Sequence, residues 1–337
     1  MQSKRVMAPK PPSRPAHETN SAVNGGSGEV GKAKEYGKGA TMPVLAADKY
    51  AEVNLPNLPQ FDPLSEDKGF KLDSTIVAVG KRRTGKSWIF RNILYLMKDR
   101  IPAGICISQT DELNKFWRQY MPKKYIFNKY QPEILDAVFL RQKKILNNPE
   151  LTQKQKDKQA PFFVILDDVI SDPAFQRNEP QIKELFVAGR HYKLFVLITT
   201  QYAKAITPTL RGNTDFLFIL KTVQQRQREA LWEDFADFLT KDAFSQMIDA
   251  YTEDNETLVV NTCPDTQVTP TEMMSWWKAV DPGPFKIGSK EYWESAFSGN
   301  QGNPPPPNTG NTSYMSATSL ASVDSMMPEW AKAMSGA

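Results

Sequence analysis

Short apolar runs alternate with amphipathic segments through the middle of this 337-residue chain. Each apolar run has the length of one strand, and several of them end at a glycine or at polar residues. The runs lie at residues 75–79, 104–108, 162–166, 194–199, 216–220 and 257–261. Strands that are apolar along their whole length and separated by helices are typical of an α/β fold, with a mostly parallel sheet covered by helices on both faces.

Segments with the spacing of amphipathic helices lie between these runs. They occupy residues 88–98, 133–146, 181–190, 224–239 and 241–250. The sequence has no internal repeat, and its length is sufficient for one α/β domain with tails. We therefore expect one folded domain over residues 46–282.

Both ends of the chain differ in composition from the middle. Residues 1–45 are rich in Pro, Gly, Ser, Ala and Lys and lack periodic apolar positions, so they predict a disordered N-terminal tail. Residues 283–337 are similar and include a proline run at 304–307, so they predict a disordered C-terminal tail. A short amphipathic patch around Trp330 is suited to docking on a partner, and a tail without a partner is the alternative.

Composition excludes several classes of protein. The formal net charge of +4 is too small to identify a nucleic-acid-binding protein by total charge. Cys106 and Cys263 lie in apolar stretches, so we expect no disulfide framework and a reducing compartment. With His17 and His191 as the histidines, no cluster has the spacing of a zinc site. Neither a signal peptide nor a membrane-spanning stretch is apparent, which predicts a soluble intracellular protein.

The strongest motif follows the first predicted strand. Its residues match G-x-x-x-x-G-K-[ST], and they are Gly80, Lys81, Arg82, Arg83, Thr84, Gly85, Lys86 and Ser87. Glycines let the backbone N–H groups converge on phosphate oxygens, and the helix that begins near Gly85 adds the positive end of its dipole. We expect Lys86 to reach the β- and γ-phosphates of ATP and Ser87 to bind Mg²⁺.

The loop also carries three bulky cations, Lys81, Arg82 and Arg83. Their side chains either contact phosphate or point to solvent or to a neighbouring subunit. An ordinary glycine-bearing turn is the alternative, and the place of the motif between a strand and a helix argues against it.

Two adjacent acids, Asp167 and Asp168, follow the apolar run at residues 162–166. In open α/β sheets the carboxyl ends of the strands form the edge that binds ligands. We expect Asp167 to hold Mg²⁺, directly or through water, and Asp168 to orient and polarise the attacking water. Two acids that only cap a loop are the alternative. The predicted strand at residues 104–108 lies between the phosphate-loop helix and these acids, which favours ATPases with an added central strand over kinases and GTPases.

The apolar run at residues 194–199 leads to Gln201. In a sheet of this type the strand would lie beside the phosphate-loop strand, so we expect Gln201 to contact the γ-phosphate or its attacking water. A polar strand cap is the alternative.

Two arginines flank the same strand: Arg190 precedes it and Arg211 follows it. An arginine supplied across a subunit boundary can neutralise charge in the transition state, and Arg190 is the first candidate. An ordinary salt bridge is the alternative for each arginine.

These motifs resemble those of one known family. The segments GKRRTGKS, FFVILDD, VAGRHYKLFVLITTQ and TPTLRGNTDFLFIL are similar to the genome-packaging ATPases of large DNA viruses, of poxvirus-like and giant-virus type, within the FtsK/HerA group of P-loop ATPases. The resemblance implies a RecA-like core, a ring that is often a hexamer, and ATP-driven movement of double-stranded DNA into a preformed capsid. It also implies a capsid or portal vertex as partner, and the virion or the host-cell cytoplasm as location. By position, the resemblance implies that Lys86 and Ser87 bind the nucleotide and Mg²⁺ and that Asp167 binds the metal. It also implies that Asp168 is the catalytic acid, that Gln201 is the sensor and that Arg190 acts in trans.

A motor that moves any sequence should bind DNA phosphates and not base edges. Two basic stretches are candidates for this contact. The first comprises Arg141, Lys143, Lys144, Lys154, Lys156 and Lys158, and the second comprises Lys221, Arg226 and Arg228. A solvated helix–loop face is the alternative for the first stretch.

Two other functions compete with DNA packaging. The chain can be another P-loop enzyme, such as a helicase or a small-molecule kinase, although neither a strand-separating element nor a substrate lid is identifiable. It can also be a structural or regulatory virion protein that binds a nucleotide without hydrolysing it. The acidic pair and Gln201 argue against this last function.

Overall fold

The structure is a computed structural model that describes residues 58–169, 175, 180–262 and 270–297. The chain divides into two units after Ala46, and every described residue belongs to the second unit. The predicted N-terminal tail, Cys263 and the amphipathic patch around Trp330 therefore lie outside the described residues.

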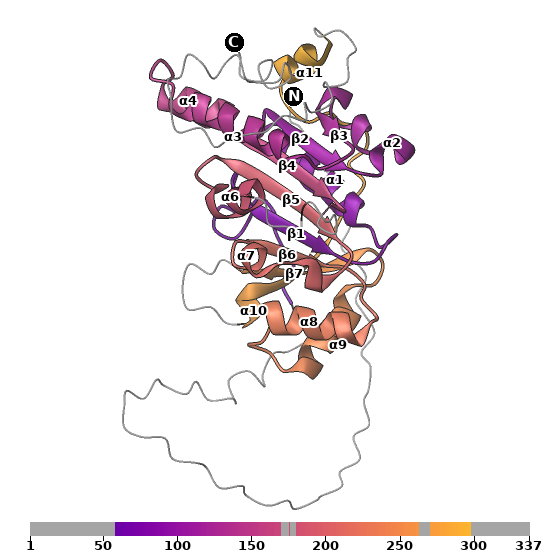
Figure 1. Ribbon diagram of the computed structural model, residues 1–337. Helices are drawn as coiled ribbons and strands as arrows, with labels where there is room; N and C mark the ends of the chain where they lie inside the picture. Colours follow the sequence, from indigo (N-terminus) through magenta and orange to yellow (C-terminus); the bar gives the residue numbers. More distant parts are fainter. Residues whose placement is uncertain (1–57, 170–174, 176–179, 263–269, 298–337) are drawn as a thin grey trace, which may run out of the picture. The chain divides into compact units, whose positions relative to one another are not determined.

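The described residues form an eight-stranded sheet with the strand order β3-β2-β4-β5-β1-β6-β7-β8 (Figure 1). The strands from β3 to β6 pair in parallel, whereas β7 is antiparallel to both β6 and β8. Their bounds are β1 Thr75–Val79, β2 Ala103–Ser108, β3 Ile126–Phe127, β4 Phe162–Asp167, β5 Leu194–Thr200, β6 Phe216–Ile219, β7 Glu256–Asn261 and β8 Met274–Lys278. All six predicted strands are confirmed, and the predicted α/β fold class with them.

The strand between the phosphate-loop strand β1 and the acidic strand β4 is β5, and not β2. β2 follows the phosphate-loop helix in the chain but pairs with the far side of β4. The added central strand is thus β5, which confirms the predicted place of residues 194–199 beside the phosphate-loop strand. β2 lies apart from β1 because helical crossovers let parallel strands that follow each other in the chain lie apart in the sheet.

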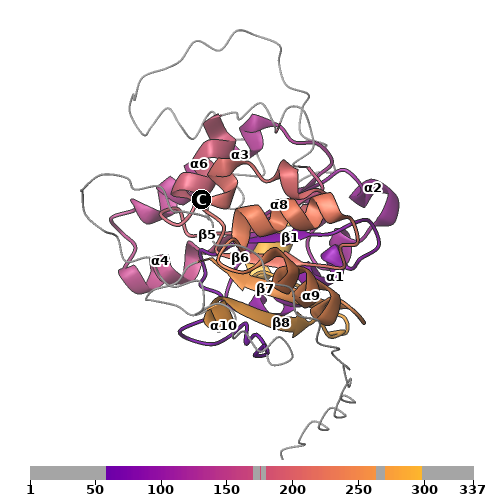
Figure 2. The same ribbon diagram turned by 90° about the horizontal axis from the view of Figure 1, so that it is seen from below.

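Helices cover both faces of this sheet (Figures 1 and 2). The five predicted helices are α1 Lys86–Met97, α3 Pro132–Leu146, α6 Pro180–Ala188, α8 Gln225–Phe235 and α9 Lys241–Tyr251. Shorter α-helices that the sequence analysis does not predict are α2 Asp111–Asn114, α4 Gln153–Gln159, α7 Pro208–Arg211, α10 Pro270–Met273 and α11 Lys290–Phe297. Short 3-10 turns are η3 Trp117–Gln119, η4 Lys123–Tyr125 and η5 Ala203–Ala205. No helix within the described ranges is long and apolar enough to cross a membrane.

The predicted boundary at residue 283 is wrong for residues 283–297, which are ordered against the domain. After β8 the chain returns along α1 to the opposite end of the sheet, and we call residues 279–297 the C-terminal strap. Val280 accepts a hydrogen bond from Asn92 in α1 at 2.7 Å, and Tyr292 donates one to the Gly104 carbonyl in β2 at 2.8 Å. Tyr292 is 4% exposed and stacks on Tyr125 with ring centroids 4.7 Å apart. Aromatic residues thus anchor a segment whose proline- and glycine-rich composition predicts disorder.

Candidate nucleotide-binding site

The predicted site residues meet where parallel strands end. The phosphate loop follows β1, Asp167 ends β4 and Gln201 follows β5. Because all three strands run in the same direction, their carboxyl ends form one edge of the sheet. The structure therefore brings together the loop, the acidic pair and the polar end of β5.

The phosphate loop folds back on its own carbonyl groups. Lys86 donates from Nζ to the carbonyl oxygens of Gly80 at 2.6 Å and Lys81 at 3.0 Å. Gly85 has a φ of 99°, in the left-handed region that glycine adopts without strain. A Cβ atom on Gly80 would lie 2.8 Å from Cβ of Leu220, so the backbone at Gly80 also needs a glycine. The glycine spacing of the motif therefore matches specific steric demands of this loop.

The first turn of α1 is suited to an anion. Gly85 provides no side-chain cap and the first turn contains no acidic residue. The leading N–H groups of a helix have no acceptor within the helix, and they carry the positive end of its dipole. With the Lys86 ammonium beside them, these groups fit a phosphate chain. The exposed Lys81, Arg82 and Arg83 leave the inside of the loop to the backbone and Lys86.

Lys86 is buried, with 7% of its surface exposed. Burial lowers the pKa of its ammonium group, and the carboxylates of Asp168 and Asp167 oppose that shift. Arg82 adds to the lowering. The positive group of the loop and the two acids thus lie close enough to influence each other, as a shared triphosphate–metal site requires.

Asp167 is held by three donors from three parts of the chain. Thr199 in β5 donates to Oδ1 at 2.9 Å, while Ser108 in β2 and the Trp117 indole in η3 donate to Oδ2 at 3.0 and 2.9 Å. Burial raises the pKa of Asp167, and these hydrogen bonds act against that rise because they stabilise the carboxylate. The carboxylate is consequently fixed in one orientation.

Asp168 has a left-handed backbone with a φ of 57°. Its N–H donates to Oγ1 of Thr199 at 2.8 Å, and its Oδ2 accepts a hydrogen bond from Nε2 of Gln201 at 2.8 Å. Aspartate tolerates this conformation better than most residues, and the turn directs the two neighbouring carboxylates to different partners. Thr199 contacts both acids and is a site residue that the sequence analysis missed.

The structure does not bring Arg190 to the phosphate loop of its own chain. Arg190 precedes β5 and donates to Oδ1 of Asp215 at 2.5 Å, while Oδ2 of Asp215 accepts from the N–H of Thr75 at the start of β1. These contacts lie at the amino ends of the strands, which form the opposite edge of the sheet. Arg211 in α7 forms an ion pair with Asp234 in α8. Both arginines form the salt bridges that the alternative interpretation expects, and Arg190 keeps 59% of its side chain exposed.

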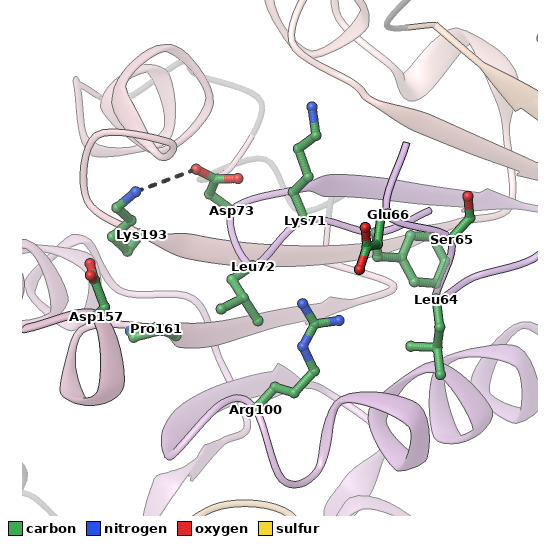
Figure 3. Close-up of a pocket in the computed structure, with 11 residues that line it drawn as sticks. Leu64, Ser65, Glu66, Lys71, Leu72, Asp73, Arg100, Asp157, Pro161 and Lys193 are labelled. Carbon is green, nitrogen blue, oxygen red and sulfur yellow. Dashed lines mark ion pairs between the residues drawn. The ribbon is translucent and has the colours of Figure 1, made fainter. Parts of the chain in front are cut away.

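A pocket of about 430 Å³ lies at this opposite edge (Figure 3). Lys193 precedes β5, Asp73 precedes β1 and Pro161 precedes β4 in its lining, and Lys193 pairs with Asp73 at 3.9 Å. The lining has cations at Lys71, Arg100 and Lys193 and acids at Glu66, Asp73 and Asp157. It contains no residue of the phosphate loop or the acidic pair, so it is not the nucleotide site.

The predicted DNA-contacting stretch divides into two parts. The prediction is wrong for Arg141, which is 3% exposed and lies with its guanidinium 4.7 Å from the ring centre of Phe162. Burial lowers the pKa of Arg141 to about 10. In contrast, α4 has no buried residue and carries Lys154, Lys156 and Lys158. Its Thr152 capping box and the hydrogen bond from Arg141 to the Gln159 carbonyl hold this helix in place.

The second basic stretch is largely engaged within the domain. Lys221 pairs with Glu253 at 2.7 Å. Arg228 pairs with Asp249 and donates to the Thr222 carbonyl at 2.7 Å, and 13% of its side chain is exposed. Arg228 is therefore a structural residue, and this stretch is a weaker candidate for a DNA contact than α4.

The comparisons with known proteins point to large DNA viruses. The protein L437 of Acanthamoeba polyphaga mimivirus is 32% identical over 224 residues, which are 66% of this chain and 78% of that protein. The protein 088R of Invertebrate iridescent virus 3 is 30% identical over 192 residues, which are 56% of this chain and 69% of that protein. No family model matches the chain.

Among solved structures, the chain is similar to the genome packaging NTPase B204 from Sulfolobus turreted icosahedral virus 2, solved in complex with AMPPCP. The identity is 16% and the TM-score 0.44, with 63% of this chain and 100% of that chain covered. At such low similarity, function has to be argued from the residues of this chain.

Proposed function

The chain belongs to the family of large-DNA-virus proteins that includes L437 of Acanthamoeba polyphaga mimivirus, and we propose that it is an ATPase that moves double-stranded DNA during genome packaging. One observation carries this proposal. The phosphate loop, the Asp167–Asp168 pair and Gln201 share one sheet edge, and a hydrogen bond joins Gln201 to Asp168 at 2.8 Å. This combination suits hydrolysis better than nucleotide storage, because it includes groups for the attacking water as well as for the phosphates.

Each residue of the edge has a task in hydrolysis. The loop N–H groups and Lys86 bind the triphosphate, and the hydroxyl of Ser87 and the carboxylate of Asp167 hold Mg²⁺. The described part of the chain holds no group of three or more His, Cys, Asp or Glu residues that could bind a metal ion without the nucleotide. Bound Mg²⁺ neutralises charge on the phosphates. Asp168 accepts a hydrogen bond from the attacking water and so directs it toward the γ-phosphorus.

The α4 helix is the proposed DNA-contacting element. Lys154 and Lys158 are exposed and Lys156 is partly exposed, so the helix presents positive charge that suits sequence-independent binding to phosphates. Two of its glutamines are engaged locally, because Gln153 donates to Asp157 and Gln155 accepts from Thr152. The net charge of +4 per chain does not argue against this, because a homo-oligomeric ring, such as a hexamer, repeats α4 in every subunit. A capsid or portal vertex is the proposed partner, in the virion or the host-cell cytoplasm.

The trans role of Arg190 belongs to the same proposal. Arg190 lies at the sheet edge opposite the nucleotide site of its own chain, and 59% of its side chain is exposed. In a head-to-tail ring that edge can face the nucleotide site of the next subunit. Hydrolysis would then depend on assembly, as in other ATPases that receive an arginine from a partner.

Hydrolysis of ATP with and without double-stranded DNA tests the proposal. We expect the full-length protein with Mg²⁺ to hydrolyse ATP several-fold faster when duplex DNA of any sequence is added. Equal rates with and without DNA would favour another P-loop enzyme. Nucleotide binding without hydrolysis, in every state of assembly, would favour a structural virion protein.

A further inference from the structure

Trp117 is the one donor to Asp167 whose direction cannot adjust. The Ser108 hydroxyl can rotate, and it has a second partner in Oγ1 of Thr110 at 3.4 Å. The Thr199 hydroxyl rotates too and also accepts the N–H of Asp168. An indole N–H, in contrast, points along one line that the ring orientation fixes. The 2.9 Å bond from Trp117 to Oδ2 therefore defines where that oxygen lies.

The turn η3, which carries Trp117, is itself fixed from two sides. On one side, the backbone N–H of Trp117 donates to Oδ1 of Asp111 at 2.7 Å, and Arg118 holds the other oxygen of Asp111 at 3.0 Å. Trp117 is 1% exposed and Asp111 is fully buried. The short turn η3 is thus attached to α2, the helix that follows β2.

On the other side, the C-terminal strap holds the end of η3. The Tyr120 carbonyl accepts a hydrogen bond from the N–H of Ile287 at 2.9 Å, and the Tyr120 ring stacks on Phe285 with centroids 4.8 Å apart. Arg91 in α1 lies over the Tyr120 ring at 5.3 Å and pairs with Asp281 of the strap at 2.7 Å. The strap and α1 therefore hold the turn whose first residue, Trp117, donates to Asp167.

From this geometry we propose that Trp117 is a positioning residue of the metal site, whose indole N–H holds the Asp167 carboxylate in the orientation that binds Mg²⁺ with the nucleotide. The proposal rests on the proposed function for one point only, the role of Asp167 toward Mg²⁺. A buried indole needs an acceptor, and a backbone carbonyl usually serves, as Leu239 does for Trp232 at 2.8 Å. Trp117 uses a carboxylate of the acidic pair instead, so its role goes beyond filling the core.

The test compares Trp117→Phe with the control Trp232→Phe in the full-length protein. A fluorescent ATP analogue is bound first in EDTA, and Mg²⁺ is then titrated into the complex until it exceeds the EDTA. The midpoint is the free Mg²⁺ concentration at which half of the fluorescence change has occurred. Loss of a group that orients a metal ligand typically lowers metal affinity about 10- to 100-fold. For Trp117→Phe we expect the Mg²⁺ midpoint to rise by about that factor, with unchanged nucleotide affinity in EDTA. Trp232→Phe loses an indole N–H of equal kind and should keep the wild-type midpoint.

A double-variant comparison separates positioning from packing. If Trp117 acts through Asp167, then adding Trp117→Phe to Asp167→Asn should raise the Mg²⁺ midpoint no further. Circular dichroism checks the fold. Should Trp117→Phe not fold, Trp117→Leu, which also lacks the indole N–H and brings no other donor, takes its place. An unchanged midpoint in a folded variant overturns the proposal, and so does the failure of both variants to fold, because packing then explains the residue.

The wild-type protein distinguishes this inference from the proposed function. Mg²⁺-dependent nucleotide binding without DNA-stimulated hydrolysis would reject the DNA motor and leave the Trp117 comparison decisive. A wild-type protein that is stimulated by DNA, together with an unchanged midpoint in Trp117→Phe, would reject the positioning role alone.

Discussion

Gln201 and Asp168 are joined by a hydrogen bond of 2.8 Å from the amide Nε2 to the carboxylate Oδ2. The two residues are 33 positions apart and follow neighbouring parallel strands, β5 and β4. The bond links the proposed catalytic acid to the strand that lies beside β1. Any shift of the γ-phosphate or of the attacking water at Asp168 can thereby reach β5, which gives the predicted sensor a physical route.

The first prediction concerns this bond. Gln201→Leu keeps the approximate size of the side chain but removes the amide that holds Asp168. We expect a decrease in kcat of about 10²-fold, within the range for a group that acts in proton transfer or orients the acid, and little change in KM for ATP. Steady-state ATPase assays measure both constants. Gln181→Leu is the matched control, because Gln181 donates to Asp136 at 3.1 Å outside the site. Equal effects of the two substitutions would contradict the sensor role.

The second prediction concerns Lys86. Lys86→Ala removes the ammonium group that donates to the carbonyls of Gly80 and Lys81, and with it the cation for the β- and γ-phosphates. We expect hydrolysis to fall by on the order of 10³-fold or more, because that charge stabilises the transition state. Circular dichroism and thermal unfolding should detect a folded domain, since the variant removes no core residue. Substantial hydrolysis by the folded variant would contradict the placement of ATP in this loop.

The sequence predicts those parts of the fold that depend on continuous patterns. β4 and β5 are buried at every position, so their apolar runs identify them directly. β3 has two residues, and the five residues of β8 show no regular alternation of buried and exposed positions, so neither strand has a pattern that identifies it. The order of the strands is not encoded in any local run. It depends on how the crossover helices pack, so the motifs predicted the place of β5 beside β1, which the structure confirms, but not the place of β2 on the far side of β4.

The candidate site divides in the same way. The glycines, Lys86 and the acids occur in contiguous motifs. Thr199 became recognisable only through the strand register, which sets it opposite Asp167. Trp117 precedes Asp167 by 50 positions and lies on a 3-10 turn without periodicity, so no sequence signal links them. The sequence did contain a signal that Arg141 is buried. Val138 lies three positions before it and Ile145 four positions after it, so all three share one helical face.

The third prediction tests Arg190 in trans. If Arg190 completes the site of a neighbouring subunit, then Arg190→Ala should lower hydrolysis about 10³-fold or more in the assembled protein. Mixing Arg190→Ala subunits with Lys86→Ala subunits should restore part of the activity, because some interfaces then combine an intact loop with an intact arginine. No recovery in mixtures that do assemble, checked by particle size, would contradict the trans role.

A control for Arg190 separates catalysis from its salt bridge with Asp215. Asp215→Asn removes the ion pair but keeps an oxygen for the Thr75 N–H, which Asp215 accepts at 2.7 Å. We expect this variant to keep most of the activity. If it loses as much activity as Arg190→Ala, the arginine acts by supporting the start of β1.

The fourth prediction separates Arg141 from the exposed lysines that follow it. Arg141→Ala removes a buried guanidinium that packs on Phe162 and donates to the Gln159 carbonyl at 3.3 Å. We expect the free energy of unfolding to fall by about 3 kcal/mol, as for other losses of a buried, hydrogen-bonded group. Urea unfolding measures this change. The salt dependence of DNA binding by the remaining folded protein should not change, because the lysines of α4 keep their charge. A slope of log K against log salt that is shallower by about 0.9 would count Arg141 itself among the phosphate contacts.

The fifth prediction concerns α4, whose lysines contribute nothing to the core. Replacing Lys154, Lys156 and Lys158 with Gln should weaken binding to duplex DNA equally for all sequences, because each lysine that binds a phosphate releases a counterion. The slope of log K against log salt should become shallower by about 0.9 for each phosphate that the variant no longer neutralises. DNA-stimulated hydrolysis should fall together with the DNA affinity, while hydrolysis without DNA and the unfolding temperature stay unchanged.

The matched control replaces Lys68, Lys241 and Lys278 and removes the same charge. These lysines are partly exposed and paired with acids on other elements. A control variant whose slope becomes equally shallow would mean that total charge, and not α4, determines DNA binding.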